Sequence, residues 1–218
     1  MDENTLLIAA YEKRCRVLGP GERYCIWTQG CFRSCTGCIA ESMKSFDEGC
    51  VILTRELLDD ILHTEGIEGI TVSGGEPFLQ AEELSKLFFD IKNKSDLGII
   101  VYTGYNYEEL EALEKRHKEI GKMLDCIDLL IDGPYEESLN YNYGLKGSVN
   151  QGTINFTDRY IDCMDLYHNP KTPRLTEIYL SEKGTFLAGV PSKNMEKSWK
   201  NFKNKENNNG NRDISEKL

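Results

Sequence analysis

The sequence predicts an α/β fold in which parallel strands form a partial, open (β/α) barrel, followed by a small C-terminal β-hairpin appendage. Short apolar segments of strand length alternate with longer amphipathic segments of helix length, which is the pattern of repeated βαβ units. The strand segments are nearly continuous apolar runs, as expected for parallel strands covered on both faces. Each run leads into a segment of glycine, cysteine or acidic residues, and functional groups gather at this end of parallel strands. Four such units are too few for a closed eight-stranded barrel.

The first unit begins with a short apolar strand over residues 25–28, which runs into a cysteine-rich loop. Thr54 is expected to cap the next helix, whose first turn contains Glu56 and whose leucine and isoleucine side chains share one face. Residues 67–73 are rich in β-branched side chains and form the second strand, which ends at a pair of glycines.

The same alternation continues through the middle of the chain. An amphipathic helix is expected over residues 80–93, where leucine, phenylalanine and isoleucine recur at helical spacing. Residues 98–102 form the third strand, residues 107–117 a charged helix, and residues 127–131 the fourth strand. Right-handed crossovers between these strands give a parallel sheet.

The pattern changes after about residue 158. Two apolar runs, at residues 175–180 and 185–190, flank a short polar turn and are typical of a hairpin. A short helix follows over residues 194–203, and the asparagine-rich end of the chain has too little apolar content to stay ordered. We therefore divide the chain into a core (1–160), a hairpin-plus-helix appendage (161–204) and a disordered tail (205–218).

Composition and charge narrow the class of protein. The chain has 218 residues and a net charge of −10, which argues against nucleic acid as a partner, since that requires a basic face. No apolar run approaches the roughly 18 residues of a membrane helix, so a soluble protein without a membrane partner is expected. The acidic start of the chain does not resemble a signal peptide. We expect a cytoplasmic protein, whose cysteines stay reduced and bind metal or act in catalysis.

Three cysteines, Cys31, Cys35 and Cys38, follow the first strand with the spacing C-x3-C-x2-C. Iron–sulfur clusters usually have four cysteine ligands, so this triplet suits a [4Fe-4S] cluster with one iron left open for another ligand. A structural zinc ion would need a fourth ligand. Cys25 or Cys50 could supply it, and zinc therefore remains an alternative.

This cysteine spacing is that of the radical S-adenosylmethionine (SAM) enzymes, and the chain resembles that superfamily. The resemblance implies that Cys31, Cys35 and Cys38 are the metal ligands and that SAM chelates the open iron through its amino and carboxylate groups. One electron from the cluster would then cleave SAM to methionine and a 5′-deoxyadenosyl radical, which removes a hydrogen atom from a substrate.

The turn after the second strand carries the next part of the resemblance. In radical SAM enzymes the matching Gly-Gly-Glu stretch contacts the SAM amino group, which assigns that role to Gly74, Gly75 and Glu76. An ordinary tight turn before a helix, with Pro77 at its first position, is the alternative. Gly37 stands where many members have an aromatic residue against adenine. It matches the activating enzymes of class III (anaerobic) ribonucleotide reductases, and it would also permit unusual loop dihedrals.

Further segments are similar to those of the same subfamily, the glycyl-radical activating enzymes. They are the Gly-Pro-Gly-x-Arg lead-in at residues 19–23, the Thr-Gly-Tyr segment at 101–105, the Asp-Gly-Pro segment at 127–135 and the Gly-Ser-x-Asn-Gln signature at 145–151. Lys146 replaces the usual arginine of that signature, and the chain continues well beyond it.

Two polar residues at strand ends have more than one interpretation. Asp132 could help to place the SAM sulfonium, could bind a small cation, or could cap the turn with Gly133, as Asp-Gly commonly does. Thr103 could donate a hydrogen bond to SAM. Both are candidate cofactor-binding residues.

The resemblance implies an enzyme that abstracts a glycine Cα hydrogen in a partner enzyme, first of all an anaerobic ribonucleotide reductase. Flavodoxin or ferredoxin would supply the electron. One alternative is a radical SAM enzyme that modifies a peptide or small molecule directly, which the extra C-terminal segment favours. The other is a non-catalytic iron–sulfur or zinc scaffold protein.

Overall fold

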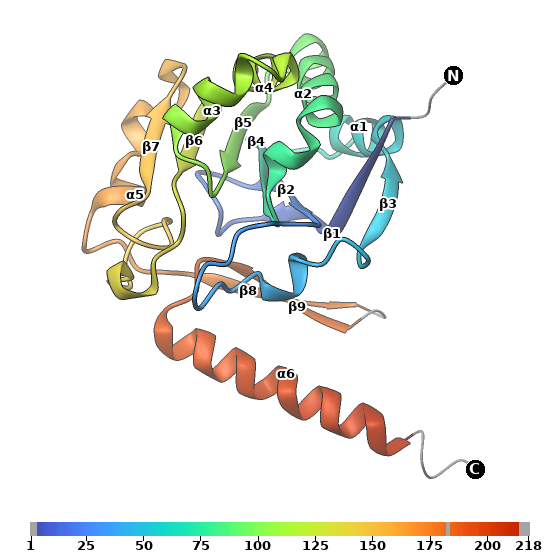
Figure 1. Cartoon of the computed structure of the whole chain (residues 1–218), viewed down its shortest axis with the longest axis vertical. Helices are drawn as coiled ribbons and strands as arrows, with labels where there is room; N and C mark the ends of the chain where they lie inside the picture. Colours follow the sequence, from blue (N-terminus) through green and yellow to red (C-terminus); the bar gives the residue numbers. More distant parts are fainter. Residues whose placement is uncertain (1–3, 182–183, 214–218) are drawn as a thin grey trace.

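The computed structural model describes residues 4–181 and 184–213. In this part of the chain a seven-stranded sheet, in the order β3-β1-β2-β4-β5-β6-β7, lies between four helices and a separate two-stranded hairpin (Figure 1). The sheet is open at both edges, β3 and β7, which confirms the partial barrel.

The parallel centre of the sheet consists of β2 (Arg23–Thr28), β4 (Gly69–Gly74), β5 (Gly98–Tyr102) and β6 (Leu129–Asp132). These are the four expected strands, each shifted by at most two residues at its start except β5, which matches. Their side chains are almost all buried, as the continuous apolar runs predict.

Helices α1 (Thr54–Leu62), α2 (Ala81–Lys94), α3 (Tyr107–Glu114) and α4 (Lys118–Leu124) cover one face of the sheet (Figure 1). The single helix expected over residues 107–117 ends earlier, and the separate helix α4 was not expected from the sequence. Its buried side chains, Ile120, Met123 and Leu124, complete the apolar core on this face. The break between α3 and α4 is favoured because it allows these apolar side chains to be buried, whereas one continuous helix would keep its charged face.

The expected cap of α1 is wrong. Leu53 occupies the N-cap position, whereas Thr54 lies in the first turn and donates its hydroxyl proton to the Asn4 carbonyl oxygen over 3.1 Å. The threonine thus ties the helix to the chain before β1.

Three antiparallel strands, β1 (Thr5–Cys15), β3 (Cys50–Leu53) and β7 (Gly152–Asn155), extend the parallel centre and were not expected. β1 alternates between buried and exposed residues and carries several charged side chains, because it meets solvent on part of one face. This alternation differs from the continuous apolar runs on which the strand assignment relied. Short helical turns lie between these elements and the hairpin, at Glu41–Met43, Pro77–Gln80, Glu137–Leu139, Asp158–Cys163 and, as α5, Asp165–His168.

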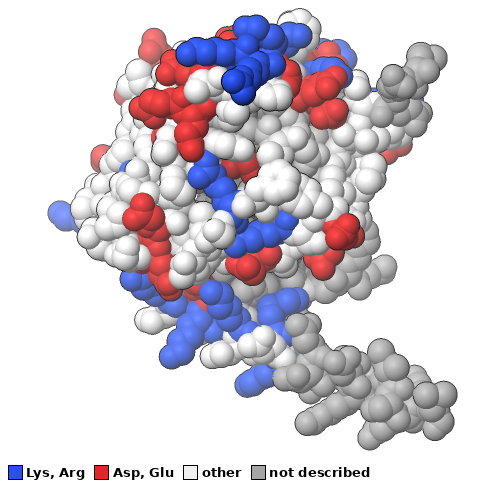
Figure 2. Space-filling model, viewed as in Figure 1, with Lys and Arg blue, Asp and Glu red and all other residues white. Residues whose placement is uncertain are grey.

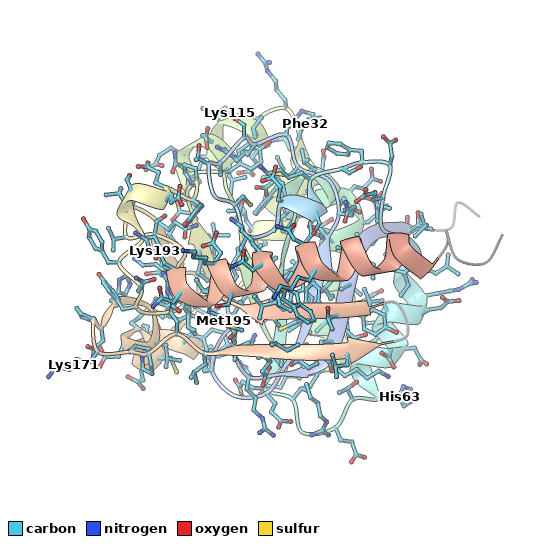
Figure 3. The ribbon with its side chains drawn as sticks, turned by 90° about the horizontal axis from the view of Figure 1, so that it is seen from below. Phe32, His63, Lys115, Lys171, Lys193 and Met195 are labelled. Atoms are coloured by element: carbon cyan, nitrogen blue, oxygen red, sulfur yellow. The ribbon has the colours of Figure 1, made fainter. Side chains whose placement is uncertain are left out.

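The other face of the sheet is covered by the C-terminal hairpin, formed by β8 (Thr176–Ser181) and β9 (Gly184–Gly189), as the sequence predicts. Phe186 of β9 meets Trp27 of β2 edge to face, with 4.6 Å between ring centroids. Helix α6 (Lys193–Asp213) lies along the hairpin on its outer side and then extends away from the body (Figures 1 and 3).

Helix α6 is longer than the short helix expected over residues 194–203, and it includes most of the segment expected to be disordered. Residues 214–218, the rest of that segment, lie outside the described residues. No described helix is long and apolar enough to cross a membrane.

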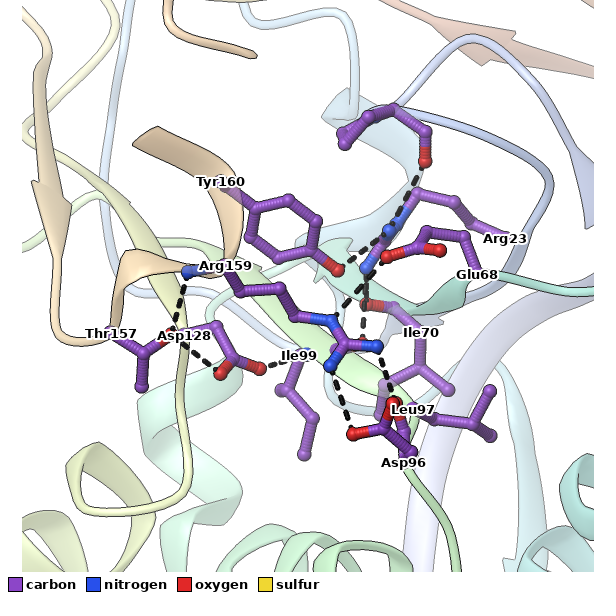
Figure 4. A network of polar contacts seen from close by, with 12 residues as sticks. Arg23, Glu68, Ile70, Asp96, Leu97, Ile99, Asp128, Thr157, Arg159 and Tyr160 are labelled. Carbon is purple, nitrogen blue, oxygen red and sulfur yellow. Dashed lines mark hydrogen bonds and ion pairs between the residues drawn. The ribbon is translucent and has the colours of Figure 1, made fainter. Parts of the chain in front are cut away.

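A polar network closes the amino-terminal end of the parallel strands (Figure 4). Arg23, the arginine of the Gly-Pro-Gly-x-Arg lead-in, is fully buried and donates to the carbonyl oxygens of Ile70 (2.6 Å) and Gly98 (3.1 Å) and to the Tyr160 hydroxyl (3.0 Å). A buried guanidinium is tolerated when its donors are satisfied in this way. Arg23 therefore has a structural role at the amino-terminal end of the parallel strands. The cysteine loop follows the opposite, carboxyl end of β2.

Candidate functional site

The carboxyl ends of β2, β4 and β5 surround a cavity of ≈ 200 Å³. The loop after β2 contributes all three cysteines of the C-x3-C-x2-C run, and the turn after β4 contributes the Gly-Gly-Glu stretch. Thr103 lines the same cavity from the end of β5. The structure thus brings together the residues predicted at these positions, which are Cys31, Cys35, Gly37, Cys38, Gly74, Gly75, Glu76 and Thr103.

The base of the cysteine loop is fixed by main-chain hydrogen bonds to the segment that follows it. The Gly30 amide donates to the Met43 carbonyl over 2.8 Å, and the Cys31 amide donates to the Lys44 carbonyl over 3.1 Å. The side-chain amide of Gln29, before the loop, also donates to the Ser45 carbonyl, after the loop, over 2.8 Å. These contacts join the two ends of the loop whose cysteines line the cavity.

Two glutamines that support the loop were missed by the sequence analysis. Gln29, directly before the loop, is 4% exposed, and Gln80 exchanges two 2.8 Å hydrogen bonds with the Leu7 main chain while also donating to the Gln29 carbonyl. Their role depends on β1, a strand that was not expected, so no local pattern in the sequence could have identified it.

The three thiols are half-buried around the cavity. Burial raises the pKa of Cys31 and of Cys38, so iron must displace their protons to bind. Among residues 4–181 and 184–213, no three histidine, cysteine or acidic side chains converge on one point as ligands of a single metal ion. In a [4Fe-4S] cluster each thiolate binds a different iron, so thiols spaced around a hollow fit the cluster.

The Gly-Gly-Glu turn packs directly against the cysteine loop. The Gly75 amide donates to the Thr28 carbonyl over 2.7 Å, and the Glu76 amide donates to the Gly30 carbonyl over 2.9 Å. Gly74 has a φ of +107°, and a Cβ on Gly75 would lie 2.3 Å from the Gly30 oxygen. Only glycine fits this approach of two main chains.

The Glu76 carboxylate is buried, with 2% of the residue exposed. It accepts hydrogen bonds from the Thr103 hydroxyl (2.7 Å) and from the amides of Gly104 (2.9 Å) and Phe78 (3.1 Å). Burial raises the pKa of Glu76, against these hydrogen bonds and the nearby positive charge of Arg33. A carboxylate has about four acceptor positions, so Glu76 retains capacity for a further donor.

Arg33, inside the cysteine run, is a further cavity residue that the sequence analysis missed. Its guanidinium lies over the Tyr105 ring at 4.5 Å and pairs with Glu109 at 2.8 Å. Its Nε atom is buried, and no described residue accepts a hydrogen bond from it. This donor at the cavity wall is available to water or to a polar ligand.

Gly37, before the last cysteine, has a φ of +72°, and a Cβ there would lie 2.9 Å from the Glu137 carboxylate carbon. The loop conformation itself therefore favours glycine at this position. This supports the conformational interpretation of the residue without excluding a role near the cofactor.

Asp132, by contrast, does not line the cavity. Its Oδ2 atom accepts the Tyr107 amide hydrogen over 2.9 Å, at the first residue of α3. Asp132 thus stabilises the start of this helix and the turn between β5 and α3.

The Gly-Ser-x-Asn-Gln signature braces the Asp-Gly-Pro turn. Gln151 accepts from the Gly147 amide over 2.8 Å and donates to the Gly133 carbonyl over 2.9 Å, while Asn150 donates to the Pro134 carbonyl over 2.8 Å. Lys146, the departure from arginine, donates to the Gln151 carbonyl over 2.8 Å. The signature therefore stabilises the turn after β6, beside the cavity.

Comparisons with known proteins cover the segment that contains this site. A family model described as "4Fe-4S single cluster domain" matches residues 17–154. The anaerobic ribonucleoside-triphosphate reductase-activating protein of Enterobacteria phage T4 is 33% identical over 147 residues, which cover 65% of this chain and 89% of the phage protein.

Pyruvate formate-lyase-activating enzymes of Staphylococcus aureus, in strains USA300 and COL among others, are 29% identical over 150 residues, or 66% of this chain. The chain spans 59% of the length of these staphylococcal relatives. The matched family segment contains every cavity residue that the sequence analysis predicted. The family model covers more than half of the chain, and the chain therefore belongs to the radical SAM enzymes, among the glycyl-radical activating enzymes.

Proposed function

We propose that Cys31, Cys35 and Cys38 bind a [4Fe-4S] cluster whose open iron binds SAM, and that the enzyme generates a glycyl radical in a partner enzyme. The observation that carries this proposal is that the three thiols and the Gly-Gly-Glu turn line one cavity and are joined by main-chain hydrogen bonds. When bound, the reduced cluster supplies one electron that cleaves SAM to methionine and a 5′-deoxyadenosyl radical, which abstracts a glycine Cα hydrogen.

The chain's own residues bind and orient SAM. Gly74 and Gly75 expose main chain at the cavity wall, where a ligand can approach closely. Glu76 accepts a hydrogen bond from the SAM ammonium group with its remaining acceptor position. Thr103 acts through Glu76, because its hydroxyl proton is already donated to that carboxylate. Gly37 presents main chain at the cavity wall beside the third cysteine, next to the adenosine portion of SAM.

Asp132 contributes from outside the cavity. By accepting the Tyr107 amide hydrogen, it positions the turn that carries Thr103 and Gly104, the two hydrogen-bond donors of Glu76 from β5 and the turn after it. We assign it a positioning role and no direct contact with the sulfonium.

The partner is an anaerobic ribonucleotide reductase, and the electron donor is a flavodoxin or ferredoxin. The name of the phage T4 relative, which is matched over 89% of its length, supports the reductase over pyruvate formate-lyase. A glycine on an extended loop suits a cavity of this size, because a single chain segment can enter where a folded domain cannot.

A second candidate function is direct modification of a peptide or small molecule. It is favoured by one observation: residues of the C-terminal extension, including Leu187 and Val190, line the cavity beside the cysteines. A concave cavity with a largely apolar lining is also suited to a small substrate.

Formation of 5′-deoxyadenosine by the anaerobically reconstituted, reduced protein tests the cluster assignment. Cys35→Ala is expected to lose the cluster absorbance and SAM cleavage together. Cys163→Ala, which alters a half-buried cysteine outside the cavity, is expected to keep both. SAM cleavage that survives Cys35→Ala would contradict the assignment.

A further inference from the structure

The cavity has a wall that lies outside the segment shared with the 4Fe-4S family. The family model ends at residue 154, whereas Leu187, Val190, Pro191 and Glu196 line the cavity together with the three cysteines. These residues come from the end of β9, the link that follows it and the first turn of α6. The C-terminal extension is therefore a part of the site, and its chemistry bears on what can enter.

The wall is packed firmly against the sheet. Ala188 is fully buried, next to Phe186 with its edge-to-face contact to Trp27. Gly189 has a φ of +101°, and a Cβ there would lie 2.6 Å from the Leu175 oxygen. This glycine turns the chain sharply out of β9, so that Val190 and Pro191 face the cavity.

Arg174 fastens the wall to other segments that line the cavity. One terminal nitrogen donates to the Asn140 side chain (2.7 Å) and to the Pro191 carbonyl (3.0 Å). The other donates to the carbonyls of Lys146 (2.6 Å) and Gly147 (3.0 Å) in the Gly-Ser-x-Asn-Gln signature. The planar guanidinium thus bonds the wall and the signature at the same time, which a lysine could not do with the same geometry.

The wall offers apolar surface and no unbalanced charge. Leu187, Val190 and Pro191 are apolar, and the Glu196 carboxylate pairs with Lys200 at 2.6 Å. Lys and Arg side chains gather on the surface at the start of α6 (Figure 2), where Lys193 is labelled in Figure 3. Such a lining suits an uncharged stretch of polypeptide better than a charged small molecule.

From these contacts we propose that Leu187 and Val190 determine substrate specificity, by admitting the main chain at a glycine and excluding residues that carry a side chain. The inference rests on the proposed glycyl-radical function and names the residues that select its substrate. A rigid apolar wall discriminates against one extra carbon by steric exclusion, which is worth roughly 10- to 200-fold in comparable pockets.

The test uses the cluster-loaded protein with SAM and two short synthetic peptides, one spanning the radical-bearing glycine of the anaerobic reductase from the same organism. The second peptide has alanine in place of that glycine. Binding is measured by fluorescence anisotropy under anaerobic conditions, and hydrogen transfer by deuterium that moves from the labelled Cα position into 5′-deoxyadenosine. The wild-type protein is expected to bind the glycine peptide at least about tenfold more tightly.

Leu187→Ala is expected to reduce this preference to about threefold or less, since it removes the steric limit. Val190→Phe, which narrows the cavity, is expected to weaken binding of the glycine peptide itself. Leu180→Ala is the matched control: Leu180 belongs to the same hairpin, is 80% exposed and does not line the cavity. SAM cleavage without peptide is expected to be unchanged in Leu180→Ala, whose side chain lies outside the cavity.

An unchanged glycine preference in folded Leu187→Ala together with normal glycine binding in Val190→Phe would overturn the inference. Failure of the proposed function looks different. In that case the wild-type protein would cleave SAM but transfer no deuterium from the glycine peptide, and the binding ratios of the two peptides would still test the wall.

Discussion

Thr103 and Glu76 join the carboxyl ends of two neighbouring parallel strands through one short hydrogen bond, 2.7 Å from the threonine hydroxyl to the buried carboxylate. The Thr103 hydroxyl also accepts the Tyr105 amide hydrogen over 3.1 Å. The hydroxyl therefore connects the turn after β5 to the Glu76 carboxylate. Orientation of this carboxylate is therefore a property of two strands and a turn. In the proposed function Thr103 therefore supports Glu76 and does not contact SAM directly.

Thr103→Val keeps the shape of the side chain and removes its hydroxyl. The expected result is SAM binding weakened by about tenfold, because a buried carboxylate that loses a donor costs roughly 1–3 kcal/mol. Equilibrium dialysis of the cluster-loaded protein with labelled SAM measures the change. Thr54→Val removes a hydroxyl that donates to a main-chain carbonyl remote from the cavity, and it is expected to leave SAM binding unaltered. Equal effects of the two substitutions would contradict the role of Thr103.

Gly75→Ala places a methyl group 2.3 Å from the Gly30 oxygen and 2.9 Å from the Met43 oxygen. Both neighbours are main chain and cannot move aside, so the free energy of unfolding is expected to fall by about 3 kcal/mol or more. Urea unfolding of the cluster-free protein measures this. In Gly121→Ala the new methyl group meets only the flexible end of Glu114, inside α4, so stability is expected to stay equal or rise by up to about 1 kcal/mol. A stable Gly75→Ala protein would show that the two loops are less tightly joined.

Glu76 gives the protein a specific dependence of stability on pH. Burial raises the folded-state pKa of Glu76 above its ordinary value of 4.5, so in the pH range just above 4.5 the folded state binds more protons than the unfolded state. The free energy of unfolding is therefore expected to fall with rising pH in that range, relative to Glu76→Gln, and the difference becomes constant above the folded-state pKa. Urea unfolding of both cluster-free proteins at a series of pH values measures the difference. A wild-type protein that gains stability over Glu76→Gln as the pH rises would mean that the hydrogen bonds outweigh burial.

Arg174→Lys keeps the charge and loses the fork that spans the cavity. Loss of two or more hydrogen bonds to buried carbonyls is expected to cost about 1–3 kcal/mol. Amide hydrogen exchange in residues 184–191 is expected to become faster, while exchange in β4 and β5 stays slow. Arg116→Lys, on an exposed part of the chain, is the control. If amide exchange became faster over the whole protein, Arg174 would stabilise the fold in general and would not act specifically on residues 184–191.

The parallel centre of the fold and the group of cavity residues were predictable because each is encoded locally. A fully buried strand such as Ile99–Val101 is apolar at every position, and a turn that brings two main chains together, such as Gly74-Gly75, needs glycine. In a parallel sheet these local signals meet at one edge, so their order along the chain is enough to place them together.

Three features could not be predicted, since each depends on contacts between distant segments. The side chains of β1 alternate between buried and exposed because one face of this strand partly meets solvent. Its charged residues therefore do not match the continuous apolar pattern by which the other strands were predicted. The sequence left the role of Asp132 open between alternatives. The partner of its carboxylate is the Tyr107 amide, whose position depends on how β6 and α3 pack together. The hairpin was recognisable in the sequence, but its place against Trp27 and beside the cysteines follows from packing that no local pattern records.

The most direct test of the proposed function is electron paramagnetic resonance of the anaerobically reconstituted protein, reduced, supplied with SAM and mixed with the anaerobic ribonucleotide reductase of the same organism. The account predicts a glycine-centred doublet that grows in the reductase in step with 5′-deoxyadenosine. Cleavage of SAM with no radical in the reductase would contradict it and would favour direct modification of a peptide or small molecule.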